Sequence, residues 1–210
     1  STANVAITAA DTLVHTGATL TLDASGLTTG RLTFIGSAEA NGTFNITGGG
    51  DSDTITGGSG ADTITGGAGG DIINGSTEND TYIISTATGD TGVASASTGN
   101  VATTALDVIT VTAGDKIDLT ASLGTDANYV TVSTVAAATF GAGMGTLATT
   151  TVYEVRGTYT SGTGFTAGDS GSDTLLYWAS ANGTTADQSI VLVGTGSVAD
   201  TIAAGILTIA

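Results

Sequence analysis

Four aspartates recur at intervals of nine residues and form the clearest chemical pattern in the chain. They are Asp53, Asp62, Asp71 and Asp80. Two positions after each aspartate stands a large apolar residue, which gives a second series of Ile55, Ile64, Ile73 and Tyr82. Calcium takes roughly six to eight oxygen ligands, from carboxylates and backbone carbonyls. A regular series of carboxylates among glycine-rich turns therefore predicts calcium sites.

The aspartates belong to four consecutive nine-residue units that fill residues 48–83. The units read GGGDSDTIT, GGSGADTIT, GGAGGDIIN and GSTENDTYI, with no insertion between them. Glycine allows the sharp turns and the close stacking that the first part of each unit requires. The end of each unit predicts a short strand whose central apolar residue points inward. We therefore expect the apolar residues to stack in one internal row and the aspartates to stack on the turn side.

This stretch resembles the RTX (repeat-in-toxin) β-roll of bacterial proteins that are exported by type I secretion. The resemblance implies an all-β fold, a parallel β-roll in which two nonapeptides make one coil and calcium lies between successive turns. The side-chain ligands that it implies are Asp53, Asp62, Asp71 and Asp80. The carbonyl ligands that it implies come from Gly49, Gly58, Gly60, Gly67 and Gly69. Asp51 is a further candidate ligand, but Asp51 and Glu78 break the glycine pattern, so the outermost sites are expected to be altered or missing.

Residues 1–47 contain short alternating segments that recur every 12 residues. These segments begin at Leu20, Leu32 and Phe44. They predict irregular β coils that stack on the N-terminal end of the roll, share its core and lack its calcium chemistry. Within them, Asp23 and Glu39 are expected in solvent or in turns.

The roll itself is assigned to residues 48–85, and residues 86–210 are assigned to a C-terminal β capping region. Residues 86–105 predict a long loop. Residues 107–120 predict a strand, a glycine turn and a second strand. Their G-D-K-I-D-L-T run is similar to the segment that follows the roll in serralysin-type metalloproteases, where it packs a cap on the roll.

Three acids of this segment, Asp107, Asp115 and Asp118, are candidates for an extra calcium site. An alternative stays open for Asp115, as a turn acid that pairs with Lys116 in solvent. Further along, Glu154 and Arg156 are expected on one strand face as a surface pair of little energetic weight.

The end of the chain predicts a β-hairpin from residues 173–178 and 188–194, followed by an apolar end at residues 205–210. This arrangement resembles the C-terminal region of type I secretion substrates. The resemblance implies that the tail is an uncleaved export signal, and the same strands are also expected in the core of the cap.

The composition excludes several classes of protein. The chain has 19 acidic and 3 basic residues, a formal net charge of −16, no Cys and one His. The charge argues against nucleic acids and anionic membrane surfaces as partners and suits a divalent cation. The absence of Cys excludes disulfides and Cys-ligated metals. No apolar run approaches the ~18 residues that a membrane span needs.

No catalytic motif is present: there is no nucleophile elbow, no phosphate loop and no H-E-x-x-H around His15. We therefore expect a domain that is not an enzyme. The first hypothesis is a structural and secretion domain of a surface-layer (S-layer) protein, located outside the cell or at the bacterial surface. Its partners would be calcium ions, the type I exporter and neighbouring copies in a lattice. The alternatives are the non-catalytic C-terminal domain of a serralysin-like protease or a lipase, and the terminal module of an RTX adhesin.

One folding mechanism is shared by all these hypotheses. Inside the cell calcium is scarce, so the aspartates repel one another and the chain stays unfolded for export. Outside the cell, calcium binding becomes folding free energy.

Overall fold

The computed structural model describes residues 3–85, 100–101, 106–123, 131–134, 151–161, 164–168, 170–178, 188–194, 202–203 and 205–209. Within these residues the fold is all-β apart from one four-residue helix, α1 (Thr120–Leu123), which confirms the predicted fold class. The loop predicted at residues 86–105 lies outside the described residues, except for the short strand β9 (Asn100–Val101).

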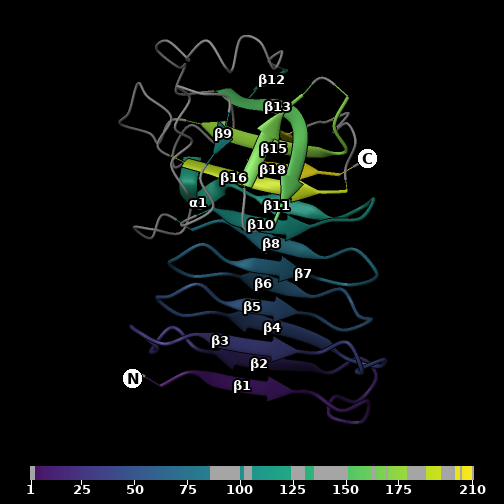
Figure 1. Ribbon diagram of the computed structural model, residues 1–210. Helices are drawn as coiled ribbons and strands as arrows, with labels where there is room; N and C mark the ends of the chain where they lie inside the picture. Colours follow the sequence, from purple (N-terminus) through teal and green to yellow (C-terminus); the bar gives the residue numbers. More distant parts are fainter. Residues whose placement is uncertain are drawn as a thin grey trace.

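The roll consists of strands that alternate between two sheets as the chain rises (Figure 1). The first sheet holds β1 (Val5–Thr8), β3 (Leu32–Ile35), β5 (Thr54–Thr56), β7 (Ile72–Asn74) and β10 (Asp107–Thr110). The second sheet holds β2 (Thr19–Asp23), β4 (Thr43–Thr47), β6 (Thr63–Thr65), β8 (Thr81–Ile83) and β11 (Lys116–Asp118). All neighbours within these two series pair in parallel. One coil of the roll therefore contains one strand of each sheet and two turns.

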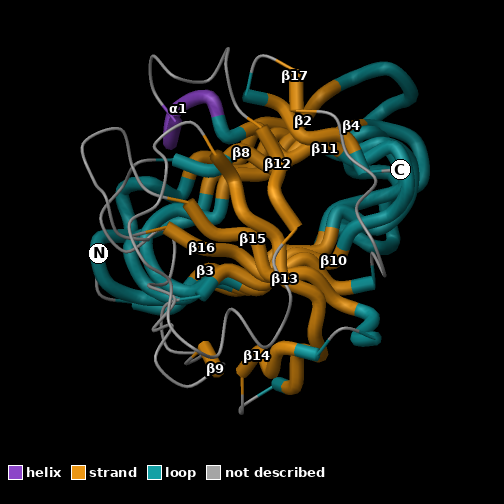
Figure 2. The backbone as a smooth tube through the Cα atoms, turned by 90° about the horizontal axis from the view of Figure 1, so that it is seen from above, coloured by secondary structure: helices purple, strands orange, loops and turns teal. Residues whose placement is uncertain are grey.

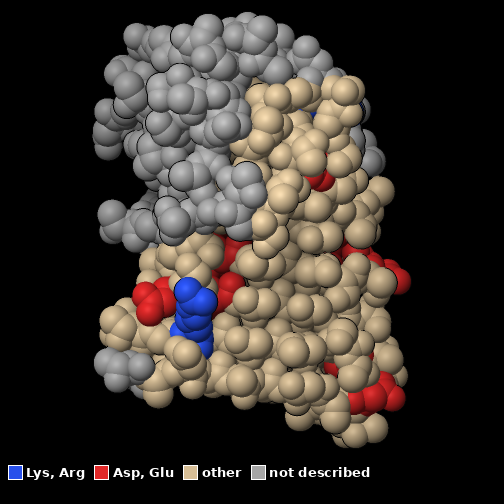
Figure 3. Space-filling model, in the orientation of Figure 1, with Lys and Arg blue, Asp and Glu red and all other residues tan. Residues whose placement is uncertain are grey.

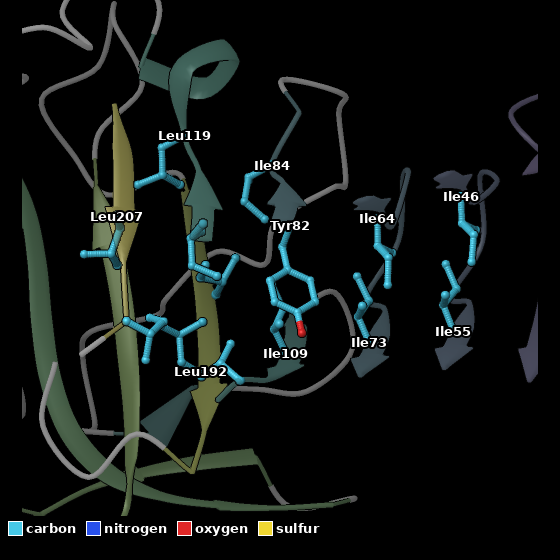
Figure 4. Close-up of a cluster of buried hydrophobic side chains, with 14 of the residues drawn as sticks. Ile46, Ile55, Ile64, Ile73, Tyr82, Ile84, Ile109, Leu119, Leu192 and Leu207 are labelled. Atoms are coloured by element: carbon cyan, nitrogen blue, oxygen red, sulfur yellow. The ribbon is translucent and has the colours of Figure 1, made fainter. Parts of the chain in front are cut away.

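The two sheets face each other across a narrow core, and the turns form the two remaining sides (Figure 2). Buried side chains of the nonapeptides fill the space between the sheets (Figure 4). Ile55 and Ile73 are paired in the first sheet, and Ile64 and Tyr82 are paired in the second. All four are at most 2% exposed, so their predicted burial is confirmed. The prediction of one row is wrong: consecutive nonapeptides lie on opposite sheets and give two facing rows.

Residues before the nonapeptides continue the same two sheets. The segments predicted around residues 20, 32 and 44 are strands β2, β3 and β4, and β1 adds a strand that the sequence did not predict. Their core is richer in aromatic rings, since Phe34 and Phe44 meet edge to face with centroids 5.0 Å apart. The boundaries of the three predicted domains stay a prediction.

The C-terminal region closes the roll with antiparallel strands. In the first sheet these are β16 (Gln188–Val193), β15 (Asp173–Trp178), β13 (Thr151–Thr160) and β14 (Gly164–Ala167), followed by β9. β12 (Thr131–Thr134) adds to β13 in parallel. In the second sheet they are β18 (Ile206–Thr208) and β17 (Ile202–Ala203). The predicted hairpin is confirmed by the antiparallel pairing of β15 with β16. The hairpin joins the roll through β16, which pairs in parallel with β10.

The cap is buried on both of its faces. One face joins the core of the roll, and the other forms a second apolar cluster around Phe165, Leu175 and Val191. Glu154 is also buried, while Nη2 of Arg156 donates a hydrogen bond to the carbonyl oxygen of Gly171 at 2.8 Å. The prediction that Glu154 lies on the surface is therefore wrong, because β13 is covered on both sides. Among the described residues, no helix has both the length and the apolar character needed to cross a membrane.

Candidate calcium sites

The turns of the roll stack in two columns, one on each side. We call turn column 1 the turns that lead from the second sheet to the first, at residues 24–31, 48–53 and 66–71. Turn column 2 comprises the turns that lead from the first sheet to the second, at residues 9–18, 36–42, 57–62, 75–80 and 111–115. Asp53 and Asp71 lie at the ends of turns in column 1, and Asp62 and Asp80 at the ends of turns in column 2. The nonapeptide aspartates therefore form two separate ladders.

Each ladder aspartate joins its own turn to the coil below. The backbone N–H of Leu32 donates to Oδ1 of Asp53 at 2.7 Å, and that of Gly49 donates to Oδ2 at 2.6 Å. Asp62 repeats this arrangement with the N–H groups of Phe44 and Gly58, both at 2.7 Å. All four nonapeptide aspartates are buried. A carboxylate that is held this way has a fixed orientation and still has lone pairs for a cation.

The same contact repeats up each ladder and continues beyond the nonapeptides. In column 1, the N–H of Asp53 donates to Asp71 at 2.7 Å, and the N–H of Asp71 donates to Asp107 at 2.8 Å. In column 2, the N–H of Asp62 donates to Asp80, and the N–H of Asp80 donates to Asp115, both at 2.8 Å. Asp107 and Asp115 thus occupy the next rung of each ladder, although they lie 36 and 35 residues further along the chain.

The three candidates that follow the roll have different surroundings. Asp107 and Asp115 are each 1% exposed, so the alternative of Asp115 as a solvent-exposed turn acid is wrong. Asp115 also accepts hydrogen bonds from the N–H and the hydroxyl of Thr112. Asp118 lies outside both ladders and binds the N–H and hydroxyl of Thr120 at the start of α1.

Burial of these carboxylates disfavours their charged form. Desolvation raises the pKa of Asp53 and of Asp62 above the ordinary value of 3.8. Desolvation raises the pKa of Asp80 to about 7, with a further contribution from the negative charges of Asp115, Asp62 and Glu78. At Asp53, the positive charge of Arg31 lowers the pKa in part. The ladders are thus short of positive charge, as the sequence predicts for a calcium site.

At Asp80, one carboxylate oxygen has no hydrogen-bond donor among the described residues. Oδ2 of Asp80 is buried and unpartnered, whereas Oδ2 of Asp62 accepts the N–H of Gly58. The difference arises at Ser76, which stands where Gly58 stands in the earlier unit. Ser76 has a φ of 84°, and its N–H donates instead to the side chain of Asn74 at 2.9 Å. Asp80 therefore has a free oxygen for a cation.

The turn glycines leave room where ligand oxygens converge. A side chain at Gly57 would collide with Oδ2 of Asp62 and with the carbonyl oxygen of Gly75 in the next coil. A side chain at Gly48 would likewise meet Asp53 and the carbonyl oxygen of Gly66. A carboxylate oxygen and a carbonyl oxygen from successive coils thus face the same point, which is the donor set that calcium prefers. The residues present fit this ion.

The described side chains contain no cluster of three or more His, Cys, Asp or Glu that could hold a metal. This follows from the geometry, because the aspartates of one column lie one coil apart in a line. An ion between two rungs must take its remaining ligands from backbone carbonyls.

The predicted carbonyl ligands all lie in the two turn columns. They are Gly49, Gly58, Gly60, Gly67 and Gly69. The carbonyl of Gly49 accepts the N–H of Ala68 from the next coil at 2.8 Å, and φ is 103° at Gly67 and 118° at Gly69. Asp51 is exposed and reaches the coil below, where its Oδ2 accepts the N–H of Gly30 at 2.7 Å. No calcium contact is described for these residues, so their role as ligands stays a prediction.

Glu39 is a functional candidate that the sequence did not identify. It was expected in solvent or in a turn, and it lies in a turn of column 2 but is completely buried. Its Oε2 accepts the N–H of Val14 at 2.8 Å, and its Oε1 accepts that of Asn41 at 3.0 Å. The bond from Val14 is the main cause of a lowered pKa for this carboxyl. The prediction of a solvent position for Glu39 is wrong, and nothing periodic in the sequence marks it. Asp23 is exposed as expected and accepts the N–H of Ser25.

On the face that Figure 3 shows, acidic atoms lie toward the two sides of the roll, with a basic side chain among those on the left, and the surface between them is mostly uncharged. This distribution agrees with the position of the acids in the turns.

The comparison with protein families matches residues 47–82 to the RTX calcium-binding nonapeptide repeat, in four copies. A search of curated proteins gave no match. The matched residues comprise the four nonapeptide strands and both aspartate ladders as far as Asp80. This part of the chain is therefore an RTX repeat domain, a structural module whose repeats bind Ca²⁺.

Proposed function

We propose that the chain is the calcium-dependent structural and secretion domain of a type I-secreted bacterial surface-layer protein. The observation that carries the proposal is the pair of buried aspartate ladders, in which burial raises the pKa of Asp53, Asp62 and Asp80. Buried ionised carboxylates are costly unless they are paired or coordinate a metal. Calcium supplies the missing charge, and its binding free energy becomes folding free energy.

The same chemistry accounts for export. In the calcium-poor cytoplasm, repulsion along the ladders keeps the nonapeptide coils unfolded, which favours passage through an exporter. Extracellular calcium modules often bind at about 10⁻⁴–10⁻³ M. The calcium-binding coils then fold only after they leave the cell, and the domain lies outside the cell or on its surface.

The tail of the chain serves as the export signal before it serves as part of the cap. Support comes from its position: β18 pairs with β11 at the end of the second sheet, and Leu207 and Ile209 are buried in the core. Folding covers these side chains, so an exporter must recognise them in the unfolded chain. The order of events is export first and burial of the tail second.

The surface-layer assignment is supported by the composition, which is rich in Thr, Ala and Gly, acidic and free of Cys. Acidic side chains on both sides of the roll provide positions where calcium can bridge neighbouring copies. The second candidate is the non-catalytic C-terminal domain of a serralysin-like protease or a lipase. It is supported by the segment around β11, which extends the second sheet beyond β8 as a cap.

Electron microscopy of the purified chain tests the surface-layer assignment. We expect ordered two-dimensional arrays in millimolar calcium and none in equimolar magnesium. Separate monomers with a folded roll at every calcium concentration would contradict lattice formation and favour the second candidate. An exporter assay in cells checks the tail: deletion of residues 206–210 is expected to abolish release into the medium.

A further inference from the structure

The coils that precede the nonapeptides close their turns without a ladder aspartate. Phe44 lies opposite Asp62 in the stacked coils, and Leu32 lies opposite Asp53, as the hydrogen bonds between them show. Both apolar side chains are about as buried as the aspartates above them. The ladder position thus changes from charged to apolar at the lower boundary of the nonapeptides.

In column 2, the carboxylate of Glu39 holds two turns together. Its bond with the N–H of Val14 reaches the turn at residues 9–18, and its bond with the N–H of Asn41 stays in its own turn. The carbonyl oxygen of Glu39 accepts the N–H of Ser59 at 3.0 Å and therefore also contacts the first nonapeptide turn above. One residue connects three successive turns of the column.

In column 1, the lower turns are also linked by hydrogen bonds between protein groups. Asp51 accepts the N–H of Gly30, and the side chain of Asn4 accepts the N–H of Arg31 at 3.0 Å. Arg31 in turn contributes positive charge close to Asp53. Links between the lowest turns of column 1 thus come from protein groups, with the positive charge of Arg31 beside them.

The two parts of column 2 differ in what occupies the ladder position. Phe44 takes that position below Asp62, whereas Asp80 and Asp115 follow as stacked carboxylates above it. Buried carboxylates that stack on one another favour a cation between them, and an apolar side chain does not.

We infer that residues 3–47 form a base of the roll that folds without calcium, with Glu39 as the residue that locks its turns, and that the calcium requirement begins at the turn formed by residues 48–53. This inference rests on the proposed calcium-dependent folding of the roll. The base presents β3 and β4 as edges on which β5 and β6 pair in parallel. It therefore acts as a template that fixes the register of the calcium-binding coils.

Hydrogen–deuterium exchange of the full chain, measured in calcium and in chelator, tests the inference. In chelator, we expect the amides of residues 13–47 to exchange within about 10-fold of their rates in calcium, and those of residues 53–83 to exchange at least ~100-fold faster. Loss of protection in both segments would overturn the calcium-independent base and leave the calcium-dependent roll intact. Retained protection at residues 53–83 would instead contradict the proposed function and, with it, the distinction between the two parts.

A matched pair of variants tests the role of Glu39. Glu39→Gln keeps the shape of the side chain and removes its charge. The amides of Val14 and Asn41 are then expected to exchange about 10-fold faster in chelator, since a neutral acceptor makes a weaker hydrogen bond than a carboxylate. Asp23→Asn removes an exposed charge on β2 and is expected to leave both amides unchanged. Equal effects of the two variants would show that Glu39 does not lock the turns. If Glu39→Gln fails to fold, the hydrogen–deuterium exchange of the unmodified chain decides the inference.

Discussion

The lower and upper coils of the roll use one backbone architecture with two ways of closing a turn. In the lower coils, up to residue 47, apolar residues occupy the ladder positions, and Glu39 accepts backbone N–H groups. In the upper coils, buried aspartates occupy the same positions and lack positive charge. Our inference therefore assigns the calcium requirement to this ladder position, and not to the parallel pairing or the apolar core that both parts share.

The largest effect is expected from the ladder itself. Asp62→Ala combined with Asp71→Ala removes one carboxylate from each column, so the calcium concentration at the folding midpoint should rise by at least ~10-fold, since loss of a charged hydrogen-bonding group costs ~1.5–3 kcal/mol. A calcium titration followed by circular dichroism measures the shift. Asp11→Ala, at an exposed position in a lower turn, is the control, and an equal shift in the control would remove the ligand assignment.

A core substitution in the lower coils should act independently of calcium. Phe44→Ala removes a fully buried ring that contacts Phe34, at a cost of about 3–5 kcal/mol. We expect a similar loss of stability in calcium and in chelator, measured by thermal unfolding. A loss that occurs only in calcium would mean that the lower coils depend on the ion as much as the upper coils.

The pH dependence should differ in sign with and without calcium. Between the ordinary pKa of 3.8 and the raised pKa of about 7 for Asp80, the folded apo roll holds a proton that the unfolded chain has released. In chelator, stability should therefore be greatest below pH 4 and fall as the pH rises to about 7. In saturating calcium, protons compete with the ion, so stability should rise with pH. Unfolding curves at pH 5 and 7.5 check this, and a pH-independent apo roll would contradict the raised pKa values.

The smallest effect is expected where the ladder ends. Asp115→Asn weakens the contacts with Asp80 and Thr112 and should cost about 1–3 kcal/mol. Asp118→Asn alters a half-exposed side chain outside the ladders and should stay within about 0.5 kcal/mol. Chemical denaturation in calcium compares the two, and a larger cost at Asp118 would show that the ladder stops at Asp80.

Periodicity explains which parts of this structure were predictable. The nine-residue phase predicted the strands around Ile55 and Ile64 and their burial, because turn and strand are local consequences of glycine and alternation. The phase alone did not predict that successive units lie on opposite sheets, since that depends on how far each turn rotates the chain. The resemblance to the RTX β-roll, with two nonapeptides in one coil, implied this arrangement. Asp107 and Asp115 carry the D-x-I pattern of the repeat, but their places on the ladders come from pairing across about 35 residues, for which no local signal exists.

Glu39 shows a different limit of the sequence. A single acid outside any repeat is usually exposed, and only the approach of the turn at residues 9–18 buries this one. Whether Glu39 meets that turn depends on how the two turns, which differ in length, align in the stack. The sequence of either turn alone does not reveal this alignment.

Calcium-dependent folding of the roll is tested most directly by far-ultraviolet circular dichroism during a calcium titration, with magnesium as the control ion. We predict a cooperative gain of β signal with calcium alone, starting from a partial signal contributed by residues 3–47. A full β signal in chelator that calcium does not change would contradict the folding switch and, with it, the proposed mechanism of export.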